Sequence, residues 1–353
     1  MAVSKLASPV VGAITNPLVT GPLLLLLTKA PDHVKEPIIR HLASIAPQLT
    51  IRRVVSSLKW LCAIGLVKHV NSWLNSFATN GWSIRSDANR WVWSQEIAVV
   101  TGGCGGIGEV VVNGLIQRGV KVAILDVQPL PKRLEHSNVF FQHCDITDPD
   151  AVNRAADQIR STLGQPSILV NNAGIGASHT ILNTSPEHLN KIFGVNLFSH
   201  WYTCQAFLPD MIKHNKGHVV TVASTASFVA LPNIADYAAT KTGALAFHEG
   251  LTQELRHRHG APNVHTTVVH PSWTSTALIA HHAKELERHY GPLLTPASVG
   301  NSILEQIFAC RGNQLILPQP HSFLSGFRGL PNWMQEKFRD NASKARMGDG
   351  TKL

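Results

Sequence analysis

Three side chains that could do chemistry together stand close in the sequence: Ser224, Tyr237 and Lys241. Tyr237 and Lys241 are four residues apart, so a helix would place the phenol and the ammonium group on one face. A nearby cation stabilises a phenolate, whose parent phenol ordinarily has a pKa near 10. The Ser224 hydroxyl could hold a substrate oxygen against the phenol. The set predicts acid/base chemistry on an alcohol or a carbonyl.

A glycine-rich loop, TGGCGGIG at 101–108, follows an apolar run and begins a helical pattern. Gly102 allows a tight turn, Gly106 lets the backbone approach a pyrophosphate, and Gly108 permits close packing of the helix. The N-terminus of that helix would face the phosphates. The residues expected to bind a dinucleotide here are Thr101, Gly102, Gly106, Ile107 and Gly108.

Asp126 ends the second apolar run, in VAILDV, and bears on the choice of dinucleotide. Its carboxylate could accept hydrogen bonds from the adenosine ribose and would repel a 2′-phosphate. The glycine loop and the position after Asp126 hold no Arg or Lys, although Lys132 and Arg133 follow a few residues on and could swing toward a phosphate. We predict NAD, with NADP as the weaker candidate.

The elements that must position these residues alternate between apolar strand runs and helical patterns. Such alternation predicts an α/β fold of the Rossmann type, a doubly wound, mostly parallel sheet of about seven strands with helices on both faces. The active site should lie at the carboxyl edge of the sheet. We expect a catalytic domain at 94–320, an N-terminal helical extension at 1–93 and an amphipathic, basic tail at 321–353.

Four sequence segments resemble those of a known family: LVNNAG at 169–174, LFSHWYTCQAFLPDM at 197–211, GHVVTVAS at 217–224 and ADYAATKTGALAFHEGL at 235–251. From about Trp93 to Pro318 the chain resembles the classical short-chain dehydrogenase/reductase family. The sequence of these segments is most similar to the branch that contains membrane- and lipid-droplet-associated retinol and 17β-hydroxysteroid dehydrogenases.

The resemblance implies roles for the residues at the reacting centre. Tyr237 would be the acid or base, and Ser224 would bind the substrate oxygen. Tyr237 and Lys241 would also contact the cofactor, with Lys241 reaching the nicotinamide ribose. Asn196, in FGVNLFSHW, matches an asparagine that binds a water linking Lys241 to solvent.

Further residues are implied at the cofactor by the same resemblance. Asp145 would lie by the adenine, Asn172 would support the sheet beside the cofactor, and Thr276 would hold the nicotinamide carboxamide. The chain departs from its relatives at Ser272, where glycine is common, which concerns the local backbone path.

The front of the chain carries most of the net charge. Residues 1–93 hold ten Lys or Arg against three Asp or Glu, which is +7 of the total of +9. The catalytic part is therefore nearly balanced, and a nucleic-acid partner is not expected. Histidines are numerous but lack the spacing of metal ligands, so no metal is predicted.

Two stretches of the N-terminal part, residues 1–93, suggest contact with lipid. The uncharged stretch VVGAITNPLVTGPLLLLL at 10–27 is interrupted by Pro17, Gly21 and Pro22, which leaves a kinked span, a re-entrant hairpin or a signal anchor open. Residues 52–77 mix apolar and basic side chains as in a helix lying on a membrane, and five of the eight tryptophans fall in residues 1–93. A helical extension packed on the catalytic domain or on a second subunit is the alternative.

These observations lead to one leading function and two alternatives. We expect an NAD(H)-dependent oxidoreductase that interconverts a hydrophobic alcohol and its ketone or aldehyde, such as a retinoid, steroid, fatty or polyketide-like compound. The apolar and basic mixture at 277–298 suits a lid over such a substrate. The alternatives are an NADPH-dependent biosynthetic ketoreductase and a non-catalytic scaffold at a lipid surface.

The expected setting follows from the same resemblance. It implies a membrane-associated protein at the endoplasmic reticulum or on a lipid droplet, with the catalytic domain in the cytosol. It also implies a homodimer formed through the helix expected at about 237–257 and the helix that precedes it.

Overall fold

The computed structural model describes residues 15–45, 50–84 and 87–343. The chain divides into two compact units, Met1–Ala78 and Thr79–Leu353.

The second unit is built on a seven-stranded parallel sheet with the strand order β3-β2-β1-β4-β5-β6-β7. The strands are β1 Ile97–Thr101, β2 Lys121–Asp126, β3 Val139–His143, β4 Ile168–Asn171, β5 Gly217–Val222, β6 Val264–Pro271 and β7 Asn313–Leu317. The order reverses between β1 and β4, the switch point at which doubly wound sheets bind ligands. The predicted fold class is confirmed.

The central strands are apolar on both faces because helices cover both sides of the sheet. All five residues of β1 are buried, and β1 pairs with β2 on one side and β4 on the other, with Ala98 opposite Val122 and Ile168. Continuous runs of Val and Ile, without polar alternation, are typical of such covered parallel strands. The same runs made these strands predictable from the sequence.

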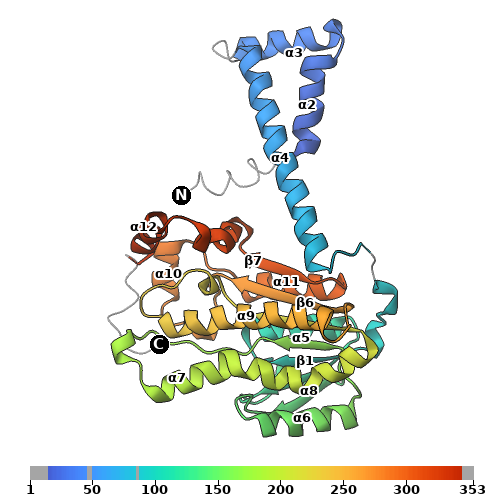
Figure 1. Cartoon of the computed structure of the whole chain (residues 1–353), viewed down its shortest axis with the longest axis vertical. Helices are drawn as coiled ribbons and strands as arrows, with labels where there is room; N and C mark the ends of the chain where they lie inside the picture. Colours follow the sequence, from blue (N-terminus) through green and yellow to red (C-terminus); the bar gives the residue numbers. More distant parts are fainter. Residues whose placement is uncertain (1–14, 46–49, 85–86, 344–353) are drawn as a thin grey trace. The chain divides into compact units, whose positions relative to one another are not determined.

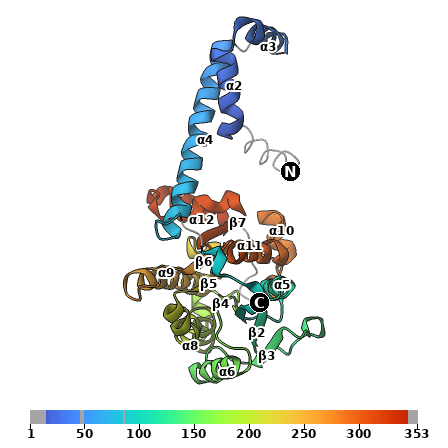
Figure 2. The same cartoon turned by 90° about the vertical axis from the view of Figure 1, so that its right-hand side faces the viewer.

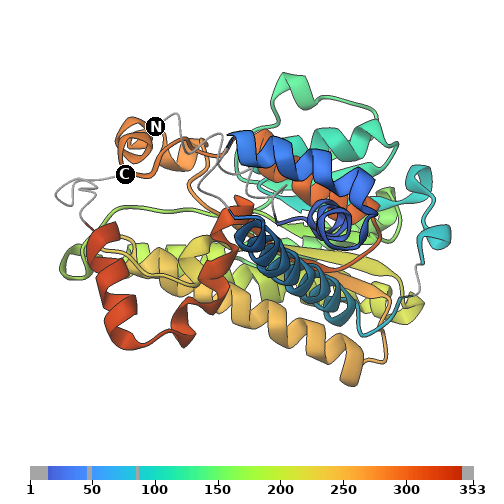
Figure 3. The same ribbon diagram turned by 90° about the horizontal axis from the view of Figure 1, so that it is seen from above.

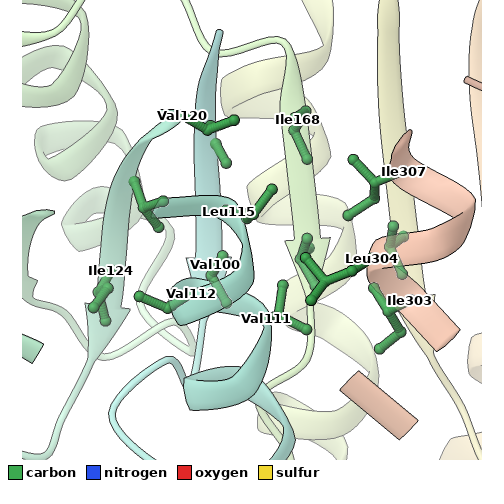
Figure 4. Close-up of a cluster of buried hydrophobic side chains, with 14 of the residues drawn as sticks. Val100, Val111, Val112, Leu115, Val120, Ile124, Ile168, Ile303, Leu304 and Ile307 are labelled. Atoms are coloured by element: carbon green, nitrogen blue, oxygen red, sulfur yellow. The ribbon is translucent and has the colours of Figure 1, made fainter. Parts of the chain in front are cut away.

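Helices α5 (Gly106–Gln117) and α11 (Pro296–Phe308) cover one face of the sheet. Figure 2 shows them on the side opposite α6 (Pro149–Thr162), α8 (Ser199–His214) and α9 (Ala235–His257). Figure 4 shows Val112 of α5 beside Ile124 of β2, and Val111 of α5 on the side of Ile303 and Leu304 of α11. A Cβ added at Gly114 would lie 2.1 Å from Leu304 Cδ1, so glycine allows the two helices to approach this closely.

The connections to the sheet carry shorter helices. The α-helices are α7 Pro186–Phe193 and α10 Ala283–Tyr290. The 3-10 segments of the described chain are η1 Ala88–Arg90, η2 Trp93–Gln95, η3 Lys132–Leu134, η4 Ile181–Asn183, η6 Thr225–Ser227, η7 Ala277–Ile279 and η8 Gln319–Gly329. A π-helical segment, η5 Gly194–Phe198, joins α7 to α8.

The C-terminal segment, η8 and α12 (Asn332–Ala342), packs on the loop that follows β5. Leu324 and Phe327 of η8 form a buried cluster with Phe228 and Val229 of that loop. Figure 3 shows this red segment beside the gold helix α9. The segment therefore covers residues next to Ser224.

The first unit consists of α2 (Pro17–Lys29), α3 (Asp32–Ile45) and the long helix α4 (Ile51–Thr79). Helices α2 and α4 lie side by side in Figure 1, and a Cβ at Gly65 would stand 1.9 Å from the Thr15 carbonyl oxygen. None of the helices in the described residues is long and apolar enough to cross a membrane. Positions 10–14 of the uncharged stretch lie outside the described residues.

Candidate active site

The glycine loop lies between β1 and α5 and adopts a backbone path that requires glycine. Gly102 and Gly106 have φ angles of 63° and 58°, in the left-handed region that other residues rarely enter. A Cβ at Gly108 would lie 2.2 Å from the Gly102 carbonyl oxygen, and one at Gly105 would meet nothing within 4 Å. The loop is thus closely packed at Gly108 and open to the outside at Gly105.

The end of β4 holds this loop in place. The Thr101 hydroxyl accepts hydrogen bonds from the backbone N–H groups of Asn172 and Ala173, at 3.0 and 3.1 Å. The Asn172 side chain donates to the carbonyl oxygens of Thr101 and Gly102, both at 3.0 Å. Thr101 and Asn172 therefore fix the loop that the sequence assigns to the dinucleotide.

The fit of a nicotinamide dinucleotide to this edge can be judged from the groups at the loop. The first turn of α5 has no side-chain cap from Gly105, so its backbone N–H groups are available to phosphate oxygens. The space over Gly105 leaves the approach open. The loop therefore has the features of a pyrophosphate cradle.

Asp126 lies at the end of β2, beside the loop. One carboxylate oxygen accepts from Cys104 N at 3.0 Å and the other from Gln128 N at 2.9 Å, which fixes the carboxylate orientation. Burial and the neighbouring Asp126 raise the pKa of the Cys104 thiol to about 12, so that thiol stays protonated. Nearby, the Arg133 guanidinium is paired with Glu109, with Nη2 2.8 Å from Oε2.

Asp145 and Thr276 lie on two other segments at the carboxyl edge. The exposed Asp145 carboxylate accepts from the N–H and the hydroxyl of Thr147, at 2.9 and 2.8 Å. Thr276 meets the glycine loop, since a Cβ at Gly106 would stand 3.4 Å from its Cγ2. Ser272 has no positive φ, so the backbone here accommodates serine in place of glycine.

Lys241 and Tyr237 lie in the first turns of α9, and Ser224 follows β5. The buried Lys241 ammonium donates to the Val222 carbonyl oxygen at 2.8 Å and lies 5.7 Å from the Tyr237 ring centroid. Ser224 accepts from Ala226 N at 3.1 Å through its hydroxyl oxygen and donates to Pro271 O at 3.4 Å. The structure thus brings the three residues singled out by spacing to one edge of the sheet.

Burial controls the protonation of this group. It lowers the pKa of Lys241 to about 8, because the ammonium is removed from water. Burial also raises the pKa of Tyr237 above 10, and the Ser224 hydroxyl offsets part of that rise. The phenol is therefore protonated at neutral pH in this structure, which is the form that can donate a proton.

Asn196 sits in the π-helical segment η5 and is fully buried. Its amide oxygen accepts from Ile175 N and its amide nitrogen donates to Ile175 O, both at 2.8 Å. A Cβ at Gly174 would lie 3.5 Å from this amide oxygen and 3.6 Å from the Lys241 ammonium. Asn196 therefore holds the segment after β4 next to Lys241. The π-turn itself could not be predicted from the sequence.

An apolar cluster adjoins Tyr237. Ile234, Ile279 and Leu286 are buried, and the partly buried residues packed against them are Leu231, Tyr237, Trp273, Leu278 and Leu293. Several of these belong to the segment 277–298, predicted to be a lid. Sequence reasoning did not identify Leu231 or Trp273, because nothing in their spacing links them to the reacting centre.

Fold and site together define a nucleotide-dependent oxidoreductase, and the chain belongs to the short chain dehydrogenase family, whose model matches residues 96–287. The family indicated by the sequence motifs and the predicted enzyme class are thereby confirmed. The protein is an NAD(P)-dependent oxidoreductase that acts on CH–OH groups and the corresponding carbonyls.

Individual relatives agree with this assignment. Dehydrogenase RED2 of Cochliobolus heterostrophus is 41% identical over 210 residues, covering 59% of this chain and 78% of the relative. Estradiol 17-beta-dehydrogenase 11 of Homo sapiens is 30% identical over 239 residues, covering 65% and 77%. A short-chain dehydrogenase/reductase from Burkholderia phymatum in complex with NAD shares the fold, with a TM-score of 0.61 and 23% identity over 69% of this chain and 95% of that one.

Proposed function

We propose that this protein uses NAD(H) to interconvert a hydrophobic alcohol and its ketone or aldehyde, with Tyr237 as the acid or base. The observation that carries the proposal is the placement of the Lys241 ammonium 5.7 Å from the Tyr237 ring, with Ser224 acting on the same phenol. A buried cation beside a phenol favours the phenolate that proton transfer leaves behind.

Each residue at the reacting centre has its own role in the proposed reaction. Bound nicotinamide supplies or accepts the hydride. In the reduction direction, Ser224 donates a hydrogen bond to the carbonyl oxygen and Tyr237 gives that oxygen its proton. The Lys241 charge stabilises the resulting phenolate, and in the oxidation direction the phenolate takes the proton from the alcohol. Asn196 keeps the segment at Ile175 in place beside Lys241.

Asp126 supports the choice of NAD. Its carboxylate is held by Cys104 N and Gln128 N, so it cannot readily turn away from a 2′-phosphate. Arg133, which could neutralise such a phosphate, is engaged by Glu109. The pyrophosphate would lie on Gly102, Gly106, Ile107 and Gly108, the adenine near Asp145, and the carboxamide near Thr276.

The apolar cluster next to Tyr237 supports a lipophilic substrate. The cluster of Ile234, Ile279 and Leu286 is apolar, and substrates are held mainly by such surface, with a few polar groups fixing orientation. The ring of Trp273 lies 5.9 Å from that of Tyr290, which adds aromatic surface at the same segment.

We further propose a homodimer formed through α8 and α9. The ring centroid of Trp201 of α8 lies 4.5 Å from that of Phe247 of α9, with the ring planes inclined by 60°, and both Trp201 and the preceding Phe198 are exposed. Aromatic surface of this kind marks interfaces. A light-scattering mass equal to one chain would contradict the dimer.

The first test is consumption of NADH, and separately of NADPH, with a panel of retinoid, steroid and long-chain carbonyls. The full-length protein is reconstituted with lipid, and Tyr237→Phe is the paired variant. We expect turnover with NADH and a loss of roughly a hundredfold or more in Tyr237→Phe, the range of general acid–base catalysis.

The binding of NADH, measured by fluorescence, should be nearly unchanged in this variant. Equal turnover of the two proteins would refute the role of Tyr237. Turnover with NADPH alone would instead favour the biosynthetic ketoreductase.

A further inference from the structure

A carboxylate directly before Tyr237 is engaged by a histidine from another helix. One oxygen of Asp236 lies 2.8 Å from Nε2 of His188, and the other accepts from the backbone N–H of Tyr237 at 2.8 Å. The Asp236 side chain is only 4% exposed, while that of His188 is 20% exposed. A buried carboxylate is costly without a partner, so this contact has energetic weight.

The position of Asp236 ties it to the start of α9. Ile234 provides no side-chain cap for this helix, so Asp236 is the acid that serves an N–H in its first turn. A negative charge here is also favoured by the helix dipole. The carboxylate therefore acts on the turn that carries the Tyr237 phenol.

His188 belongs to α7, which follows the segment leading from β4. The N–H of His179 in that segment donates to Asn233 O at 2.9 Å, and the His179 ring lies 4.9 Å from the His188 ring. Further along the chain, η5 continues α7, and the side chain of its Asn196 accepts a hydrogen bond from Ile175 N. The segment 174–188 is thus joined to α9 and η5 at several points.

The same segment lies against the reacting centre. A Cβ at Gly176 would stand 3.5 Å from Cδ2 of Tyr237 and 3.4 Å from Cδ1 of Leu278. A displacement of this segment would therefore change the space next to the phenol. A misplacement of about 1 Å can cost two orders of magnitude in rate.

We propose that His188 and Asp236 are positioning residues of the reaction, which hold the segment 174–188 against the start of α9 and so fix Tyr237 relative to the substrate. This inference rests on the proposed role of Tyr237. It assigns the pair no contact with the substrate or the dinucleotide.

The test compares His188→Leu, which removes the hydrogen-bonding nitrogen, with His188→Gln, whose side-chain amide can donate to Asp236. His257→Leu, at the exposed end of α9, is the control. We expect His188→Leu to lower kcat about tenfold or more while the NADH dissociation constant changes less than about twofold. His188→Gln should recover most of kcat, and His257→Leu should match the wild type.

Hydrogen exchange of the amides in 174–188 gives a second readout, which does not require turnover. Exchange should be faster in His188→Leu than in the other two variants. If His188→Leu does not fold, Asp236→Asn takes its place in both measurements.

The positioning role would be overturned if His188→Leu kept the kcat and the amide exchange rates of the wild type. It would also be overturned if His188→Leu and His188→Gln lost kcat equally. Failure of the proposed function has a different signature, namely equal turnover of the wild type and Tyr237→Phe.

Discussion

Lys241 combines a functional position with an energetic cost. Its ammonium is 3% exposed and keeps one backbone partner, Val222 O. Burial lowers its pKa from 10.5 to about 8, which means that the folded protein holds this proton less tightly than the unfolded chain. Sites that must hold a desolvated charge are expected to be less stable than they could be.

This cost predicts a pH-dependent gain in stability for Lys241→Met. Below pH 8 the folded state carries the full penalty, about 3 kcal/mol from the shift, and the penalty disappears as pH rises through 10.5. The variant should therefore unfold at higher denaturant concentration than the wild type at pH 7, and the difference should shrink between pH 8 and pH 10.5.

Urea unfolding at a series of pH values measures this difference, and turnover should be lost in the same variant. Lys284→Met, on α10, is a control for removal of a lysine charge outside the reacting centre. A stability difference that does not vary with pH would show that burial of the charge is not its cause.

The residues at the reacting centre were predictable to different degrees. Ser224, Tyr237 and Lys241 could be identified because their types and short spacing are meaningful on one helix and the strand before it. Asp236 could not be linked to His188, because the two are 48 positions apart and only the packing of α7 on α9 brings them together. Their roles in the reaction stay predictions until the variants are measured.

At the scale of elements, apolar runs and glycine positions were the strongest signals. The residues of β1 and β4 are all buried and mostly aliphatic, as are Val122–Leu125 of β2, and the loop before α5 requires positive φ at Gly102 and Gly106. The π-turn at Gly194–Phe198 has no comparable signal, since its sequence continues the helical pattern on both sides. The contacts of the C-terminal segment likewise depend on long-range packing.

Arg328 of η8 connects that segment to the loop after β5. Its guanidinium donates to Phe228 O at 3.2 Å and to Ser227 O at 3.4 Å. Ser227 in turn donates its hydroxyl proton to the Lys241 carbonyl oxygen at 2.8 Å. The loop that begins at Ser224 is thus held between η8 and α9.

We expect Arg328→Ala to loosen this loop. The loss of hydrogen bonds from a charged donor should lower the free energy of unfolding by about 1–3 kcal/mol. It should also reduce kcat several-fold without weakening NADH binding, because the glycine loop lies on other strands. Denaturant titration and steady-state kinetics check this, with Arg311→Ala, at an exposed arginine after α11, as the control. Unchanged kcat would mean that η8 only covers the loop.

At the scale of the whole molecule, the two units differ in what they expose. The catalytic unit buries its apolar strands, whereas α4 exposes a broad apolar surface that includes Trp60, Leu66, Val67, Val70 and Trp73. Such surface on a helix, with basic residues nearby, is typical of segments that lie in a membrane interface. We therefore propose that the first unit attaches the protein to the surface of a membrane, such as that of the endoplasmic reticulum, or of a lipid droplet.

The attachment can be tested by flotation of the full-length protein with vesicles of phosphatidylcholine and phosphatidylserine. Trp60 and Trp73 are 70% and 58% exposed, and Trp333 of the catalytic unit, at 68%, is a matched control. Replacing Trp60 and Trp73 together by serine should reduce the bound fraction about tenfold or more, because each indole contributes apolar area to the interface. Trp333→Ser should float like the wild type. A loss confined to Trp333→Ser would place the lipid contact on α12 instead, and wild-type protein that stays with the soluble fraction would refute attachment to these lipids.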